Sequence, residues 1–177
     1  MTVTIEQLDA AAARAALPEL IAVLNDAVEG GASVGFLLPL ADGELERYWE
    51  GVLVSVLGGD KILLVARQSA WIGGTVQVAL ESRANGSHRA EIQKLLVHRS
   101  ARRQGIGVAL MRAAEEAARA AGRSLLVLDT AGDDAERLYR RLGYQLAGVI
   151  PRYARSTNGP LEGSSFMYKD LPEAGGQ

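Results

Sequence analysis

Residues 102–107 read RRQGIG and lie between the apolar run EIQKLLV (residues 91–97) and the alanine-rich stretch VALMRAAEEAARAA (residues 108–121). The run predicts a strand and the alanine-rich stretch a helix, so the two glycines occupy a turn that opens a helix. The first N–H groups of a helix have no partner within it, and together with the helix dipole they favour an anion. Glycine also lets the backbone approach a ligand closely. The stretch is therefore either an anion cradle or an ordinary turn with solvated arginines.

Two common phosphate-binding motifs fit this turn poorly. A P-loop ends in Gly-Lys followed by Ser or Thr, which is absent here. A dinucleotide-binding fingerprint needs a third glycine, and the glycine spacing is wrong even though Asp129 could supply its acidic residue. Arg102 and Arg103 are cations at the start of a helix, where they oppose the dipole unless an anion lies there. The arginines therefore favour the cradle.

Hydrophobic periodicity predicts the other elements of the chain. Ahead of the turn we expect a strand at 3–8, helices from Pro18 to Gly30 and from Asp42 to Gly58, and strands at 61–67, 71–80 and 89–97. After it we expect a helix at 105–121, a strand at 124–130, a helix at 133–143 and the closing strands YQLAGVI and SSFMYKDL. This order predicts a single α/β or α+β domain around a mixed sheet over residues 1–170, followed by a flexible C-terminal tail at 171–177.

The composition excludes several classes of site and partner. The net charge of −2 and the pI near 5.7 give no reason to expect nucleic acid as a partner. The chain has no cysteine and two histidines, which excludes disulfides and thiolate chemistry and makes a metal site unexpected. We find no secretory leader and no apolar run of about 18 residues, so we expect no membrane partner and a cytoplasmic location.

Arg102, Gly105 and Gly107 match the Arg/Gln-x-x-Gly-x-Gly/Ala signature of the GNAT superfamily of N-acetyltransferases, in which this turn holds the pyrophosphate of acetyl coenzyme A (acetyl-CoA). AERLYRRLGY (residues 135–144) is similar to the family's Ala-x-x-x-Tyr-x-x-x-Gly-Phe/Tyr segment, and the order of elements is also the family's. Arg103 stands where the family commonly has glycine. The resemblance implies the GNAT fold, a mixed central β-sheet of about six to seven strands with flanking helices.

The same resemblance implies an acyltransferase that binds acetyl-CoA as the acetyl donor and needs no metal. The residues that it assigns to the coenzyme are Leu95, Leu96, Val97, Arg102, Arg103, Gln104, Gly105, Ile106, Gly107 and Tyr139. A backbone N–H of Leu95–Val97 would polarise the thioester carbonyl, as in the family. Since the chain has no cysteine, we expect direct transfer in a ternary complex rather than an acetyl-enzyme.

Two carboxylates are candidates for the general base. An alkylammonium with a pKa near 10 is about three units from its neutral form at neutral pH, and a nearby base is the usual remedy. Glu91 lies eleven residues before Arg102, where GNAT enzymes that use a strand carboxylate place their base. Asp129 ends the apolar run SLLVLD, where it could be the base or bind the substrate ammonium. Glu91 could instead pair with Arg89 or Lys94 at the surface, and Asp129 could merely begin a turn.

Tyr139 occupies the tyrosine position of the family, where the hydroxyl lies near the coenzyme sulfur and serves as general acid. A phenol has a pKa near 10 and a thiol one near 8.5, so complete proton transfer to the thiolate is uphill. A strong hydrogen bond could suffice. The alternative is that Tyr139 is a core aromatic residue.

The stretch GGASVGF (residues 30–36) connects the first two predicted helices, a segment that flanks the acceptor pocket in the family. The resemblance therefore places Ser33, Val34, Gly35 and Phe36 at the acceptor, with Glu91 and Asp129. The stretch could equally be a helix stop and a packed loop. Together with RAEIQKLLV, LDT and LYRRLGY, it is similar to the tabtoxin acetyltransferases of the family, which act on a small amino-acid-like toxin.

This resemblance implies a small-molecule primary amine as the acceptor, namely an amino-acid-like metabolite, toxin or antibiotic, with a role in resistance to such a compound. Two alternatives stay open: acetylation of a protein N-terminus or lysine, and a non-catalytic domain that senses acyl-CoA. A homodimer through the C-terminal strands would fit the family.

Overall fold

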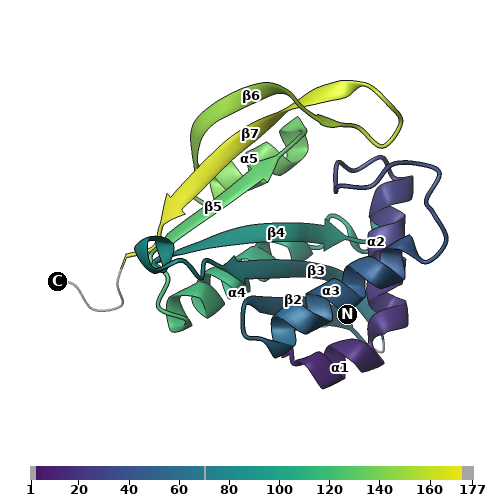
Figure 1. The fold of residues 1–177 in the computed structure, drawn as a ribbon, viewed down its shortest axis with the longest axis horizontal. Helices are drawn as coiled ribbons and strands as arrows, with labels where there is room; N and C mark the ends of the chain where they lie inside the picture. Colours follow the sequence, from purple (N-terminus) through teal and green to yellow (C-terminus); the bar gives the residue numbers. More distant parts are fainter. Residues whose placement is uncertain (1–2, 70, 173–177) are drawn as a thin grey trace.

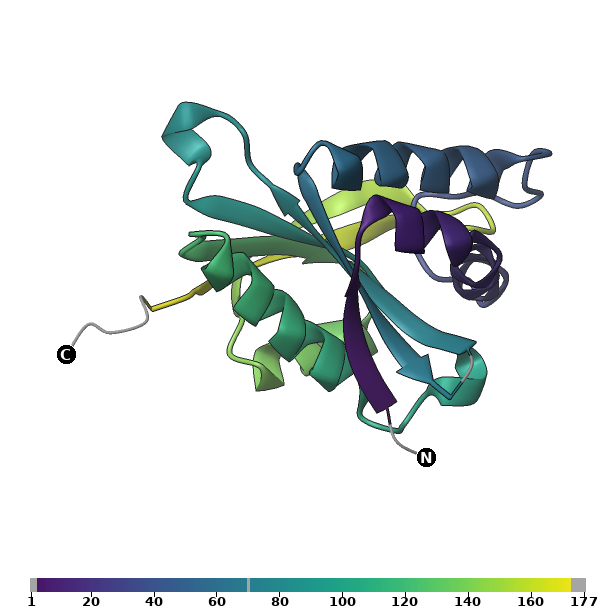
Figure 2. The same cartoon turned by 90° about the horizontal axis from the view of Figure 1, so that it is seen from below.

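The computed structural model describes residues 3–69 and 71–172, and within them one seven-stranded sheet carries helices on both faces (Figure 1; Figure 2). The strands are β1 (Val3–Leu8), β2 (Lys61–Gln68), β3 (Trp71–Leu80), β4 (Arg89–Val97), β5 (Leu125–Thr130), β6 (Gln145–Arg155) and β7 (Leu161–Asp170). The helices are α1 (Ala10–Ala15), α2 (Leu17–Glu29), α3 (Glu44–Leu57), α4 (Ile106–Ala120) and α5 (Asp133–Arg141), with two 3₁₀ turns, η1 (Ala84–Gly86) and η2 (Arg99–Ala101).

The strands lie side by side in the order β1-β2-β3-β4-β5-β7-β6, and β4 and β5 are the parallel pair in an otherwise antiparallel sheet. The predicted mixed sheet with flanking helices is thus confirmed. The 10–15 stretch forms α1, which we did not predict because a run of alanines carries no apolar periodicity. Within the described part of the chain, no helix has the length and apolar character needed to cross a membrane.

The last two strands are longer than predicted. β6 continues past Pro151, where we expected it to stop, because it is an edge strand and its pairing with β7 is irregular between Ile150 and Ala154. An edge strand with an irregular register tolerates proline, since the missing N–H breaks no ladder bond. Leu171, assigned to the tail, is only 3% exposed and donates its N–H to Ser124 O (2.7 Å), so the folded chain includes it; residues 173–177 of the tail lie outside the described residues.

The sheet separates two hydrophobic cores (Figure 2). Successive residues of a strand point to opposite faces, so Leu64 of β2 packs with α4 while Leu63 packs with α2 and α3. α4 presents a stripe at helical spacing to its core, formed by Ile106, Leu110, Met111, Ala114 and Ala118. Each fully buried large aliphatic side chain contributes roughly 1.5–3 kcal/mol. The two cores together hold the sheet rigid beneath the loops at its edge.

The sheet is interrupted at its centre. β4 and β5 are paired only from Arg89↔Leu125 to Glu91↔Val127, and beyond Glu91 the two strands diverge (Figure 1). β4 also carries an irregularity opposite Thr75–Gln77 of β3, where Lys94 adopts a left-handed backbone with φ 50°. A bulge of this kind bends a strand and redirects side chains. The divergence leaves a wedge between β4 and β5.

The packing of β3 against α4 can be tested at Gly74. A Cβ at this position would lie 2.8 Å from Leu96 O and 3.1–3.2 Å from the Leu110 and Ile106 side chains. We expect Gly74→Ala to lower the free energy of unfolding by about 1–3 kcal/mol, because the strand and the helix must move apart. Urea unfolding measures the change.

Gly51 provides the matched control. Gly51 is an exposed residue of α3, and a Cβ added to it would have no neighbouring atom within 4 Å. Gly51→Ala should raise the free energy of unfolding by roughly 0.5–1 kcal/mol through helix propensity. Equal stability of the two alanine variants would contradict close packing at Gly74.

Candidate active site

A cavity of about 460 Å³ opens where β4 and β5 diverge. Its wall comes from the loop after α2, from Tyr48 of α3, Lys61 of β2, β4, β5, α5 and the β6–β7 hairpin. Figure 1 shows how these elements are arranged. The lining residues that the sequence predicted are Ser33, Val34, Gly35, Glu91, Leu95, Leu96, Asp129 and Tyr139. The fold thus brings together three stretches that are separated by more than thirty residues in the chain.

Phe36 is placed differently from the expectation. Its side chain is 8% exposed, belongs to the core under α2 and α3, and contacts the Tyr48 ring edge-on with the ring centroids 5.5 Å apart. Tyr48, and not Phe36, lines the cavity. The sequence around an aromatic residue after a glycine loop does not indicate whether its side chain faces the cavity or packs in the core. Phe36 therefore supports Tyr48 from behind and does not reach an acceptor in the cavity.

The turn at 102–107 has the geometry of an anion cradle. Gly105 (φ 78°) and Arg103 (φ 62°) are both left-handed, so Arg103 has the conformation that glycine would adopt at the position where the family commonly has it. The first N–H of α4 with a hydrogen-bond acceptor is that of Ala109, which donates to Gly105 O (3.0 Å). Among the described residues, the N–H groups of 103–108 donate to no protein acceptor. Several free donors at the start of a helix favour a phosphate group.

Tyr139 lies on α5, and its side chain is 7% exposed at the cavity wall. Burial, together with the negative charge of Asp129, raises the pKa of Tyr139 to about 12. The phenol is thus protonated at neutral pH and can donate a hydrogen bond or a proton to a developing anion. Tyr144 packs against it edge-on, with the ring centroids 5.7 Å apart.

Comparisons with known proteins identify the family. Residues 59–146 match the family model described as an acetyltransferase (GNAT) domain. An uncharacterized N-acetyltransferase of Azospirillum brasilense is 36% identical over 129 residues, which make up 72% of this chain and 74% of that protein. The chain belongs to the GNAT family of acetyltransferases.

Solved structures agree with this assignment. A ribosomal-protein-alanine N-acetyltransferase from Brucella melitensis is 26% identical, with a TM-score of 0.79 over 95% of this chain and 99% of that one. A GNAT phosphinothricin acetyltransferase from Sinorhizobium meliloti, solved with acetyl-CoA, has a TM-score of 0.79 over 100% of this chain and 93% of that one; at 20% identity it shows the fold alone. The predicted superfamily, fold and enzyme class are confirmed: this GNAT protein is an acyltransferase.

The two carboxylates of the GNAT site lie on either side of the wedge. Glu91 is the last residue of β4 that is paired with β5, and Asp129 lies near the end of β5, where its Oδ2 accepts a hydrogen bond from Ser164 Oγ (2.8 Å). Arg89, one of the partners considered for Glu91, instead contacts Glu81 (2.7 Å). Within the described ranges Glu91 lines the cavity and forms no salt bridge.

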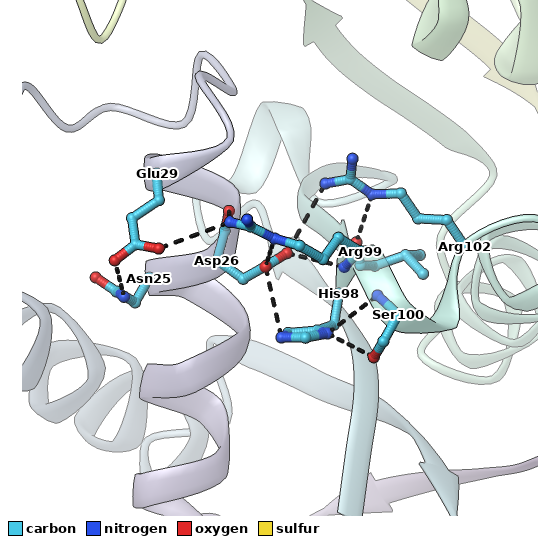
Figure 3. A network of polar contacts seen from close by, with 8 residues as sticks. Asn25, Asp26, Glu29, His98, Arg99, Ser100 and Arg102 are labelled. Atoms are coloured by element: carbon cyan, nitrogen blue, oxygen red, sulfur yellow. Dashed lines mark hydrogen bonds and ion pairs between the residues drawn. The ribbon is translucent and has the colours of Figure 1, made fainter.

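Two side chains predicted to contact the coenzyme are engaged with the protein. Gln104 accepts a hydrogen bond from Gln68 Nε2 (2.7 Å) and donates to Ser100 O (3.3 Å), so its side chain braces the turn. Arg102 donates from Nε to Val97 O (3.2 Å), and its Nη2 lies 3.8 Å from Asp26 Oδ2 (Figure 3). Neither of these two side chains lines the cavity, nor does Val97. The free N–H groups of the turn are therefore the candidates for binding an anion.

Asp26 joins this turn to α2 (Figure 3). Its side chain is 6% exposed; its carboxylate accepts the Arg99 N–H (2.9 Å) and the Arg99 guanidinium, and lies 3.5 Å from His98 Nε2. Burial opposes ionisation, but the hydrogen bonds from Arg99 outweigh it, and the pKa of Asp26 is lowered. The carboxylate thus holds the segment after β4 against the helix whose following loop forms part of the cavity.

Lys61, Lys94 and Tyr48 line the cavity and were not predicted from the sequence. Lys94 interrupts the apolar letters of EIQKLLV, which is the one signal that could have indicated it. Lys61 begins a strand, a common place for a solvated lysine. In the part of the chain that the structure describes, no group of three or more histidine, aspartate or glutamate side chains could hold a metal ion.

The Asp26 network generates a pH-dependent prediction. We expect Asp26→Asn to lower the free energy of unfolding at pH 7 by about 2 kcal/mol, because an amide replaces the buried acceptor of a charged donor. Since the folded pKa lies below the usual 3.8, the contribution of Asp26 is complete above that value and is lost as the pH falls through the folded pKa.

The difference between the wild type and Asp26→Asn in urea unfolding should therefore shrink over the range from pH 3.8 down to the folded pKa of Asp26. A difference that stays constant over this range would refute the buried ion-pair role. Glu29→Gln offers the matched change at an exposed carboxylate of α2, whose Oε2 lies 3.6 Å from Arg99 Nη2, and it should not reproduce the effect.

Proposed function

We propose that this GNAT acetyltransferase transfers the acetyl group of acetyl-CoA to the primary amine of a small molecule, by direct transfer in a ternary complex. The observation that carries the proposal is the meeting of Tyr139, Asp129 and Glu91 in one cavity at the divergence of β4 and β5. A buried phenol and two carboxylates supply the acid and the base that aminolysis of a thioester requires.

The coenzyme is proposed to lie along β4, with its pyrophosphate on the N–H groups of the 102–107 turn and its thioester beside Leu95–Val97. Support comes from the unpaired N–H groups of the turn and from the end of β4–β5 pairing at Glu91, beyond which the β5-facing edge of β4 has no strand beside it. A backbone N–H there would polarise the thioester carbonyl. The N–H groups of the turn therefore suit a pyrophosphate, and the open edge of β4 suits the thioester arm.

The acceptor amine is proposed to lie between Glu91 and Asp129. One carboxylate, directly or through a water, takes the proton that the ammonium must lose before its nitrogen attacks the carbonyl carbon. As the C–S bond breaks, the Tyr139 hydroxyl donates a hydrogen bond, or its proton, to the departing sulfur. A phenol with a pKa of about 12 stays protonated until that negative charge develops.

Several narrower expectations stay predictions. They are the similarity to tabtoxin acetyltransferases, a role in toxin or antibiotic resistance, a cytoplasmic location, the choice of base between Glu91 and Asp129, and the expectation that neither nucleic acid nor a membrane is a partner. A homodimer is also proposed. It is supported by exposed apolar side chains on the edge strand β6, among them Val149, Ile150 and Tyr153.

Release of free coenzyme A thiol tests the proposal. The purified protein should consume acetyl-CoA with some members of a panel of small primary amines, with mass spectrometry showing an N-acetylated product. Turnover confined to peptides that present a free N-terminus or lysine would favour a protein acceptor, the kind of acceptor for which the Brucella relative is named. Tight acetyl-CoA binding without turnover of any amine or peptide would favour a sensor and would contradict the proposal.

Tyr139→Phe tests the general acid. We expect kcat to fall by about 10²-fold while the KM for acetyl-CoA changes little, because the lost hydroxyl acts in the transition state. Tyr144→Phe is the matched control, since Tyr144 is buried beside Tyr139 but does not line the cavity. A kcat for Tyr139→Phe within about twofold of the wild type across the pH range would remove this role.

A further inference from the structure

The bulge of β4 directs an unusual lysine into the cavity. Lys94 has a left-handed backbone (φ 50°), a conformation that the Cβ of an L-residue disfavours. Its Nζ lies 5.6 Å from the centroid of the Tyr48 ring and 4.0 Å from the place a Cβ on Gly35 would occupy. The ammonium is therefore enclosed between the aromatic ring and the loop after α2.

A second ammonium shares this end of the cavity. Lys61 Nζ donates to Gln77 Oε1 (3.0 Å) and Gln93 Oε1 (2.9 Å), while Gln77 Nε2 donates to the Tyr48 hydroxyl (2.9 Å). Desolvation, followed by the positive charge of Lys94, lowers the pKa of Lys61. Two lysines that are partly withdrawn from water and repel one another are an unfavourable arrangement unless an anion joins them.

No carboxylate of the described residues supplies that anion. Neither Lys61 nor Lys94 has a carboxylate oxygen within 4.0 Å. Desolvation lowers the pKa of Lys94, and the negative charges of Asp129 and Glu91 raise it by less, so the pKa is lowered overall. The third carboxylate of the wall, Glu162, also forms no salt bridge with either lysine. Among the described residues, then, no carboxylate in contact balances these two ammonium groups, and an anionic ligand in the cavity would do so.

We infer that the acceptor carries a carboxylate in addition to its amine, and that Lys94, assisted by Lys61, binds this carboxylate at the Tyr48 end of the cavity. The inference rests on the proposed function, because it assigns a substrate class to the same site. An amino acid then lies with its amine toward Asp129 and Glu91 and its carboxylate toward the lysines. Charge-assisted hydrogen bonds in a partly desolvated site are strong and specific, and the amide of the same acid would leave the lysines unpaired.

Substrate pairs test this orientation. Each α- and ω-amino acid of a panel is compared with its own carboxamide, with rates expressed per unprotonated amine. The wild type should prefer the acids in kcat/KM by about tenfold or more, because the carboxamide cannot pair with the ammonium groups. Lys94→Met should reduce the preference to under about threefold, mainly by raising KM for the acid, while Lys94→Arg should retain part of it.

Arg112→Met is the matched control. Arg112 is an exposed residue of α4 outside the cavity, and its replacement also removes one positive charge. It should leave the preference within about twofold of the wild type. A preference that is the same in Lys94→Met as in the wild type, or a wild-type preference for the carboxamides, would overturn the inference.

A binding measurement separates this inference from the proposed function. The chain has three lysines, so ¹³C-lysine NMR resolves each of them, with Lys61→Met and Lys94→Met for assignment. Addition of N-acetyl-4-aminobutyrate, but not of its carboxamide, should raise the pKa of Lys94. A raised pKa of Lys94 without turnover of any amine would support the anion site and contradict acetyl transfer. Turnover with no change in this pKa and no preference for acids over carboxamides would overturn the anion site alone.

Discussion

The short parallel pairing of β4 and β5 is the constraint on which the rest of the site depends. Three residue pairs hold the strands together, and pairing ends at Glu91. If the ladder continued, the cavity would be filled and the β5-facing edge of β4 would be occupied by β5. Because it stops there, a carboxylate from each strand and the phenol of α5 border one space. The bulge at Lys94 bends β4 within the same stretch and adds a cation to that space.

The two hydrophobic cores meet at this interruption of the sheet. α4 and its core support the turn at 102–107, while α2 and α3 support the loop that carries Ser33–Gly35. Asp26 joins the two through Arg99 and the neighbouring side chains of His98 and Arg102. A buried carboxylate that contacts two guanidinium groups fixes the distance between the 102–107 turn and the 30–36 loop better than apolar contacts would, since its hydrogen bonds are directional.

The sequence was informative where chemistry depends on neighbouring residues and uninformative where it depends on distant ones. The glycine turn and the Tyr139 helix are local patterns, and their resemblance to the GNAT family implied the fold and the class of enzyme. Lys61 and Lys94 are brought together by strand register and by a bulge that no local pattern of EIQKLLV predicts. Phe36 and Tyr48 are in contact, so which of them faces the cavity depends on the exact course of a loop. The same holds for β6, whose course past Pro151 depends on its place at the edge of the sheet.

The two cores on opposite faces of the sheet have a consequence for how such an enzyme diversifies. The donor turn is built on one core, while the acceptor loop with Tyr48 is built on the other. Under the proposed function, replacements in the 30–36 loop or in α3 would alter the acceptor side of the cavity, while the packing beneath the 102–107 turn belongs to the other core. Under the same proposal, the sheet separates the part of the fold that would set the choice of amine from the part that would hold the acyl donor.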